Sequence, residues 1–217
     1  MARIMKSVVV VCLSIIAIPI LFGACDTVGG GGLSVQADTA FDRTGTLRSD
    51  GVFTSMMTNN YAIAGSEVIP GVGDKAERAI VSVVLNQVPA GANVTRVLLR
   101  LKGAAAEGDP FGKFGNMSVD HIDVVSSISA DAFAGKTLTA GIGTITTLPG
   151  NILSAQTVEL DVTAQVQADL AAGRPISSFR FLFANAPAND LTVNEVFFHA
   201  NSGDEALRPQ AQIYYTQ

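Results

Sequence analysis

The sequence has no tryptophan, only three tyrosines and only two cysteines among its 217 residues. Tryptophan and tyrosine combine a flat apolar face with a polar edge, so their scarcity disfavours glycan binding by ring stacking. Both cysteines, Cys12 and Cys25, lie near the N-terminus. The rest of the chain therefore cannot form a disulfide within itself, and burial of apolar side chains must hold it together.

Positive charge is also scarce, with 14 Lys and Arg against 19 Asp and Glu and a net charge of −5. Binding to nucleic acid requires clustered Lys and Arg side chains. The charge balance therefore excludes a nucleic-acid partner, and it does not favour docking onto anionic lipid headgroups. An acidic, well-solvated surface is the simplest interpretation of the excess of carboxylates.

The first 22 residues have the pattern of a secretory leader. Arg3 and Lys6 form a positively charged start, and residues 7–22 form an uncharged run rich in Val, Ile and Leu. This run is shorter than the roughly 20 apolar residues that cross a bilayer as a helix. The pattern therefore predicts a signal peptide rather than a membrane span.

Residues 21–25, Leu-Phe-Gly-Ala-Cys, resemble the lipobox of bacterial lipoproteins. The resemblance implies that a signal peptidase cuts between Ala24 and Cys25 and that the Cys25 thiol carries a diacylglycerol. The protein would then be attached to a lipid bilayer of the cell envelope, at the outer membrane or cell surface or at the periplasmic face of the inner membrane. The alternative is an ordinary signal peptide followed by an incidental thiol.

Four consecutive glycines at positions 29–32 follow the cysteine closely. Such a run loses too much backbone entropy to form a helix or strand and behaves as a flexible spacer. A spacer of this kind suits a domain attached to a membrane surface. The expected organisation is therefore a signal peptide over residues 1–24, a lipidated cysteine and tether over 25–35, and one domain over 36–217.

After the tether the segments are short, β-branched and separated by Gly, Pro, Asn and Asp at intervals of about 8–12 residues. This pattern predicts an all-β fold, an antiparallel, jelly-roll-like β-sandwich. In the strand expected over residues 94–101, Thr95, Val97, Leu99 and Leu101 form the more apolar face, which should point inward. The spacing of apolar residues predicts one short α-helix over residues 163–172, ended by Gly173.

Three segments occur in a recognisable order: LNQVPAGANV at 85–94, DVTAQVQ at 161–167 and RPQAQIYY at 208–215. Together they resemble the DNRLRE-type, carbohydrate-binding-module-like β-sandwich of bacterial and archaeal surface proteins. The resemblance spans residues 65–215. It implies a jelly-roll-like module with a binding or structural role, and it supplies no catalytic residues that could be carried over.

His121 and Asp123 are two residues apart, and on a strand their side chains would share one face. An imidazole and a carboxylate in this arrangement could bind a metal ion or form a solvent-facing hydrogen-bonded pair. A structural calcium ion would need six to eight oxygen ligands. Loop residues that could supply some of these ligands are Asp38, Asp42, Asp50, Asn189, Asp190, Asn201 and Asp204.

Catalytic motifs are scarce. No Gly-x-Ser-x-Gly sequence is present, and two histidines offer little choice of general base. Glu159 and Asp161 could form a carboxylate pair, although Asp161 is also well placed to cap the expected helix. The sequence therefore favours a non-catalytic binding or scaffolding module with a glycan or protein partner in the cell envelope. The alternatives are a carbohydrate-binding module and a hydrolase with a carboxylate-based site.

Overall fold

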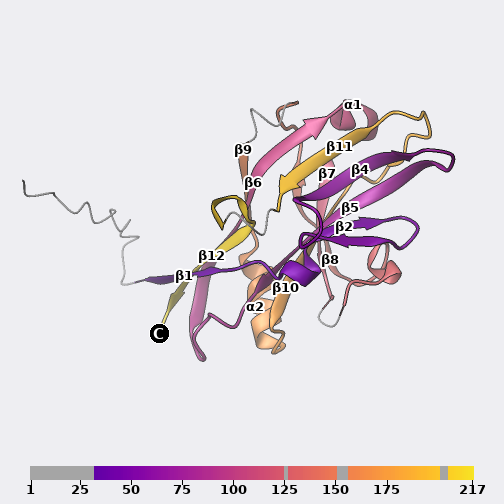
Figure 1. Ribbon diagram of the computed structural model, residues 1–217. Helices are drawn as coiled ribbons and strands as arrows, with labels where there is room; N and C mark the ends of the chain where they lie inside the picture. The colour runs from indigo at the N-terminus through magenta and orange to yellow at the C-terminus, as the bar shows by residue number, and fades with distance from the viewer. Residues whose placement is uncertain (1–31, 125–126, 151–155, 201–204) are drawn as a thin grey trace, which may run out of the picture.

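The computed structural model describes residues 32–124, 127–150, 156–200 and 205–217. Its strands form one antiparallel network that folds over on itself into a β-sandwich (Figure 1). The first layer contains β1 (Leu33–Ala37), β12 (Gln210–Thr216), β6 (Asn93–Glu107), β9 (Gln156–Asp161), β11 (Asn194–His199) and the start of β4 (Tyr61–Ile69). The second layer contains β3 (Phe53–Ser55), β2 (Gly45–Arg48), β5 (Gly73–Val84), β10 (Ile176–Leu182), β7 (Met117–Ile122) and β8 (Thr137–Ile145).

Strand β4 connects the two layers. Its residues 61–66 pair with β11, and its residues 65–69 pair with β5. The core lies between the layers and is built from alternate residues of strands on both sides. The largest fully buried side chains in it include Phe179, Phe181 and Phe198. The predicted all-β sandwich is therefore confirmed.

Strand β6 shows why the predicted inner face is only partly right. Val97, Leu99 and Leu101 are fully buried, as their alternation predicts. At the start of the strand, however, Val94 is buried and Thr95 is exposed. The pairing with β12 shifts by one residue between Tyr214 and Tyr215, and this irregularity moves the preceding side chains of β6 to the opposite face.

Two α-helices lie at opposite ends of the sandwich (Figure 1). Helix α2 (Thr163–Ala171) matches the predicted helix and packs against β6 and β10. Helix α1 (Pro110–Phe114) is additional to the one helix that the sequence predicts. It forms because the Asp109 carboxylate accepts a hydrogen bond from the Gly112 N–H at 3.0 Å, and proline is well suited to the first turn. Short 3-10 turns occur at Phe41–Arg43, Ala130–Ala132 and Glu205–Leu207.

A second apolar cluster covers the outer side of β5 and β7, which we call the covered face. Its buried members are Leu47, Ile80, Ile122, Val124 and Ala132, with Phe53, Ile128 and Phe133 packed against them. The segment 127–136 lies over this cluster. Arg180 holds it by donating to the carbonyl oxygens of Ala132, Phe133 and Gly135 and, at 2.6 Å, to the Asp120 carboxylate.

Candidate functional site

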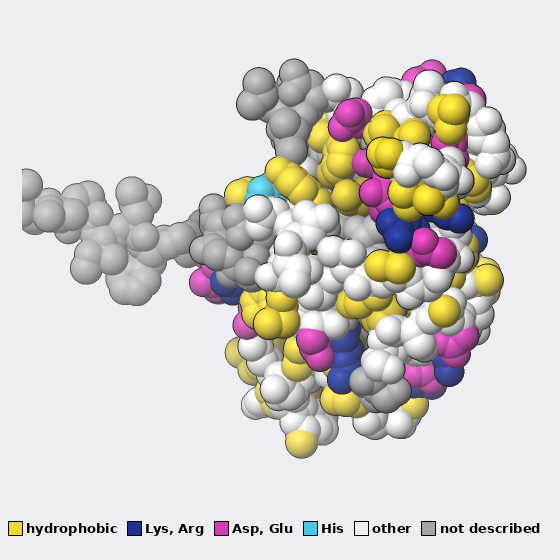
Figure 2. Space-filling model, turned by 45° about the vertical axis from the view of Figure 1, so that its right-hand side comes forward, with side chains coloured by type: hydrophobic (Ala, Val, Ile, Leu, Met, Phe, Trp, Pro, Cys, Tyr) yellow, Lys and Arg dark blue, Asp and Glu magenta, His cyan; other side chains and the backbone are white. Residues whose placement is uncertain are grey.

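The outer side of β4, β11 and β6 differs from the covered face, and we call it the open face. Along β11, Val196 and Phe198 point into the core, so Glu195, Phe197 and His199 point outward. Along β4, Tyr61, Ile63 and Glu67 point to the same side, because Tyr61 pairs with His199 and Ile63 with Phe197. Figure 2 shows a histidine beside hydrophobic side chains, with acidic side chains next to them.

Three rings form an aromatic group on this face: Tyr61, Phe197 and His199. The Tyr61 ring lies 5.8 Å from Phe197 and 5.1 Å from His199, in both cases edge to face. All three side chains are partly exposed. Edge-to-face contacts hold the rings in fixed orientations, so the group offers a preformed apolar surface to a ligand.

A row of glutamates crosses the strands beside the aromatic group. Strand pairing places Glu77 and Glu195 on either side of Gly65, and Glu107 lies opposite Glu195 on the next strand. Gly65 has no side chain between the two carboxyl groups. A Cβ atom at this position would lie 2.2 Å from the Asn194 carbonyl oxygen, so only glycine allows this close approach of the strands.

Both central carboxyl groups have pKa values well above the ordinary value of 4.5. Burial, followed by the charges of Glu195 and Glu67, raises the pKa of Glu77 to about 8. Burial, followed by the charges of Glu107 and Glu67, raises the pKa of Glu195 to about 7. The two carboxyl groups therefore lie close enough for the charge of Glu195 to raise the pKa of Glu77.

Glu77 also lines a small pocket of about 130 Å³ between the β2–β3 hairpin and β4, which we call the Glu77 pocket. Its other lining residues are Thr46, Arg48, Val52, Thr54, Asn59, Ile63 and Glu67. Arg48 lies at its rim and forms ion pairs with Asp50 at 2.9 Å and with Glu67 at 3.1 Å. The pocket is contiguous with the open face because Ile63 and Glu67 belong to both.

The predicted pair His121 and Asp123 does not come together on one strand face. Strand β7 ends at Ile122, and the backbone N–H of Asp123 donates to the Lys136 carbonyl oxygen. His121 points into the sandwich, where its Nε2 lies 2.8 Å from the Asp169 carboxylate of α2. Among the described residues, no group of three or more His, Cys, Asp or Glu side chains is placed to hold a metal ion.

Asp169 explains this arrangement, since it is fully buried and also accepts a hydrogen bond from Arg174 at 2.9 Å. The His121 ring in turn stacks on Phe179 at 5.7 Å. The three polar side chains fasten α2 to the inner side of the sheet. A signal for this contact was present in the sequence, because Asp169 follows Val166 at helical spacing and so shares the apolar side of the helix.

The carboxylates of Glu159 and Asp161 have separate structural roles. Glu159 forms a half-exposed ion pair with Arg100 at 2.7 Å. Asp161 accepts a hydrogen bond from the Thr163 backbone N–H at 3.0 Å. It thus contacts the first residue of α2, although the N-cap residue is Val162, whose side chain makes no capping bond. The carboxyl groups that the fold does bring into contact are instead Glu77 and Glu195.

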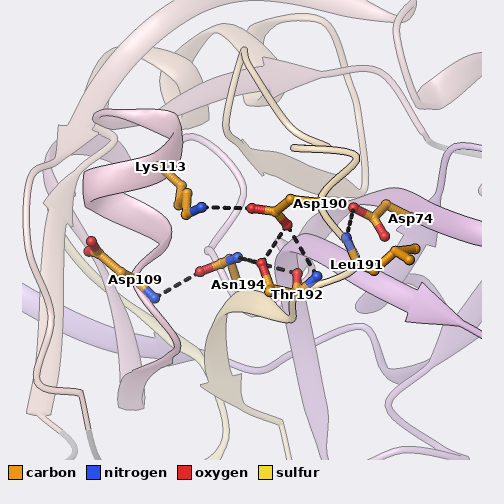
Figure 3. A network of polar contacts seen from close by, with 7 residues as sticks. All are labelled: Asp74, Asp109, Lys113, Asp190, Leu191, Thr192 and Asn194. Atoms are coloured by element: carbon orange, nitrogen blue, oxygen red, sulfur yellow. Dashed lines mark hydrogen bonds and ion pairs between the residues drawn. The ribbon is translucent and has the colours of Figure 1, made fainter.

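The loop carboxylates considered as calcium ligands bind protein donors instead. In Figure 3, Asp190 contacts Lys113 at 2.6 Å and also accepts hydrogen bonds from Thr192, and these bonds, with the lysine first, lower the pKa of Asp190 to about 2. The Asp74 carboxylate in the same view accepts from the Leu191 backbone N–H at 3.1 Å. Asp42 pairs with Arg43, and Asp38 accepts a hydrogen bond from Gln87. Asn201 and Asp204 lie outside the described residues.

A second hollow, of about 530 Å³, lies between helix α2 and residues 88–94. These are two of the segments that carry the DNRLRE resemblance. The hollow is lined mainly by small and apolar residues, and the Gln167 amide that reaches it is bonded to the Val94 carbonyl oxygen at 2.7 Å. Such contacts are those of a turn packed on a helix, and they leave few free polar groups for a ligand. The open face is therefore the stronger candidate site.

Cys25 and Ala24 lie outside the described residues, as does the leader. Within the part of the chain that is described, no helix is long and apolar enough to cross a membrane. A scan against protein-family models found no match, and a search of curated proteins found none either. The functional reading of the chain therefore depends on its own residues.

Sequence reasoning missed the aromatic group and the Glu77–Glu195 pair. Two signals could have found them. The alternation along residues 194–199 places Glu195, Phe197 and His199 on one face of a strand. In addition, Gly65 in the middle of a strand pattern indicates a close backbone approach. The pairing of Glu77 with Glu195 itself depends on the register of strands that are far apart in the sequence.

Proposed function

We propose that this protein is a lipoprotein of the cell envelope that presents its β-sandwich as a non-catalytic binding module. Acylated Cys25 attaches the chain to the bilayer, and the glycine run lets the domain reorient. The observation that carries the binding role is the open face. There, partly exposed Tyr61, Phe197 and His199 lie beside carboxyl groups on three paired strands. Surfaces that combine exposed aromatic rings with polar side chains are typical of ligand sites.

A carbohydrate is the ligand class that this face favours. Sugar rings offer C–H groups to aromatic faces and hydroxyl groups to carboxylates, and both partners are present on the open face. The grouping of Tyr61 with Phe197 and His199 offsets the scarcity of Trp and Tyr in the chain. The resemblance of residues 65–215 to the DNRLRE-type module supports the same class, and membership of that family stays a prediction.

Hydrolysis is the weaker candidate because there is little room for a substrate beside the carboxyl groups. Glycoside hydrolases bind the scissile sugar between two carboxyl groups. The pocket beside Glu77, of about 130 Å³, is small for a sugar residue and its leaving group. The pair is therefore better suited to binding than to bond cleavage.

The anchor is tested by comparing Cys25→Ser with the parent in membrane fractions, with Cys12→Ser as the matched control. We expect Cys25→Ser to lose the acyl mass in mass spectrometry and to leave the lipoprotein fraction, while Cys12→Ser behaves as the parent. An unmodified Cys25 thiol in the purified parent would contradict the proposal.

The binding role is tested with a glycan panel applied to the detergent-solubilised full chain. We expect Tyr61→Ala to weaken any hit by about two- to tenfold, because an aromatic contact contributes about 0.5–1.5 kcal/mol beyond its buried area. Tyr214→Ala is the matched control, since Tyr214 is also partly exposed but lies on β12. Equal glycan binding by the two variants would show that the ligand does not bind at the open face.

A further inference from the structure

We propose that the Glu77 pocket binds a protonated primary amine, with the Glu77 carboxyl group as the acceptor at its base. This site goes beyond the proposed function, because it does not require the aromatic group. It gives a chemical class to a pocket in which a buried carboxyl group has an oxygen atom without a partner. The argument has three parts: the unpartnered atom, the charges around it and the shape of the pocket.

Glu77 is an unusual side chain for an outer part of a sandwich. It is only 7% exposed, and its Oε2 atom has no hydrogen-bond partner among the described residues. A buried polar atom left without a partner is destabilising, and nearly all such atoms in folded proteins are satisfied. A bound hydrogen-bond donor would satisfy Oε2. Because Glu77 lines the pocket, a donor bound there would lie beside its carboxyl group.

The charges around Glu77 favour a donor that is also a cation. Glu67 on β4, Glu195 on β11 and Glu107 on β6 all contribute negative charge at this junction. Two basic side chains oppose them. Arg48 on β2 is already bonded to Glu67 and Asp50, and Lys75 on β5 pairs in register with Glu67. The junction therefore has more carboxylates than cations.

The lining oxygens select a primary ammonium group among the cations. An ammonium group has three N–H donors and no acceptor, so it needs three oxygens around it. Besides the carboxyl groups, the pocket offers the side-chain oxygens of Thr46, Thr54 and Asn59. A calcium ion prefers several carboxylates, and among the described residues no group of three or more His, Cys, Asp or Glu side chains is placed to hold a metal ion. A volume of about 130 Å³ suits an ammonium group on a short alkyl chain.

Binding must displace a proton. Burial, followed by the nearby carboxylates, raises the pKa of Glu77 to about 8, so this group carries a proton at neutral pH. An ammonium ligand favours the ionised form of the carboxyl group, and the Glu77 proton then passes to solvent. Affinity should therefore rise between about pH 6 and pH 8, while a primary amine of pKa about 10.4 stays protonated throughout.

The test is titration calorimetry on the detergent-solubilised full chain with n-butylammonium chloride as the probe. Tetramethylammonium chloride is the matched probe, since it has the same charge but no N–H donor. We expect n-butylammonium to bind about tenfold or more tightly than tetramethylammonium, with proton release seen as a dependence of the measured heat on the buffer. Equal affinity for the two cations, or no binding of n-butylammonium, would overturn the proposal.

Two variants locate the site. Glu77→Gln replaces a largely protonated carboxyl group by a side chain of the same shape, and we expect it to reduce n-butylammonium affinity about tenfold and to abolish proton release. Glu159→Gln is the matched control, because Glu159 lies on exposed β9 and forms only a surface ion pair. A thermal unfolding curve confirms that each variant is folded. Parent-like binding by Glu77→Gln would refute the assignment.

The natural amine could belong to an amino sugar or to a lysine side chain, and two further probes distinguish them. Glucosamine should lose affinity in both Tyr61→Ala and Glu77→Gln if the open face and the pocket bind one ligand. An Nα-acetyl-lysine amide should lose affinity only in Glu77→Gln. If n-butylammonium binds but no glycan does, the pocket assignment stands and the carbohydrate proposal fails. If glycans bind and no amine does, the reverse holds.

Discussion

The two outer faces of the sandwich use buried charge in opposite ways. On the covered face, Arg180 and Asp120 are 3% and 7% exposed, and the arginine also donates to three carbonyl oxygens of the overlying segment. On the open face, Glu77 and Glu195 are equally buried, but both are acids. Opposite charges fasten a loop over the first face. On the second face, burial and neighbouring carboxylates raise the pKa of both acids, and such shifts are typical of functional sites.

The largest expected effect comes from breaking the pair on the covered face. Arg180→Met leaves the Asp120 carboxylate buried without its cation, which should lower the free energy of unfolding by about 3–5 kcal/mol. Arg100→Met is the control, because the Arg100–Glu159 pair is exposed and should contribute only about 0–1 kcal/mol. Urea denaturation of both variants measures the difference. Similar losses in the two would mean that Arg180 does not hold the covered face.

The next effect concerns the pH dependence of stability. The folded-state pKa of Glu77, about 8, lies above its ordinary value of 4.5, so the folded state binds more protons than the unfolded state between those values. Stability should therefore fall as pH rises from about 4.5 to 8. Glu195, with a pKa of about 7, adds to this fall.

Glu77→Gln should flatten this dependence and make the protein more stable than the parent near pH 8.5. Chemical denaturation of the two proteins at about pH 5.5 and pH 8.5 measures the effect. The same measurement on Glu159→Gln should reproduce the slope of the parent. An unchanged slope in Glu77→Gln would show that this carboxyl group is ionised in the folded protein.

The smallest effect on stability is expected for the aromatic group. Tyr61→Ala removes a partly exposed ring with two edge-to-face partners and should lower the free energy of unfolding by about 1 kcal/mol. Phe181→Ala removes a fully buried ring of the core and should lower it by about 3–5 kcal/mol. Thermal unfolding compares the two. A large loss in Tyr61→Ala would assign this residue to the core rather than to the open face.

Local patterns predicted much of the fold. The turn spacing indicated the β-sandwich, the alternation in β6 placed Val97, Leu99 and Leu101 in the core, and the spacing around Val166 predicted α2 almost to the residue. These features depend on neighbours in sequence. Within β6, side-chain direction was wrong only where the pairing slips by one residue at Tyr215, because the sequence carries no clear mark of that irregularity.

The candidate site was less accessible to prediction for the same reason. Glu77 and Glu195 meet only because two strands pair on either side of Gly65, and no local pattern specifies which strands those are. His121 likewise contacts a carboxylate of α2 rather than the one two residues away. The residue types alone indicated that carboxylates and imidazole would interact. Which carboxylate each of these side chains contacts depends on the tertiary arrangement.

The pairing of the first strand with the last has a practical consequence. Leu33 lies opposite Tyr215, so the entry and exit of the domain are neighbours on one edge of the sheet. A short peptide could join these ends, and new ends could be opened at a surface turn without changing a single strand neighbour. The whole domain could also be inserted into a loop of a host protein, or attached through its C-terminus, with the open face unchanged.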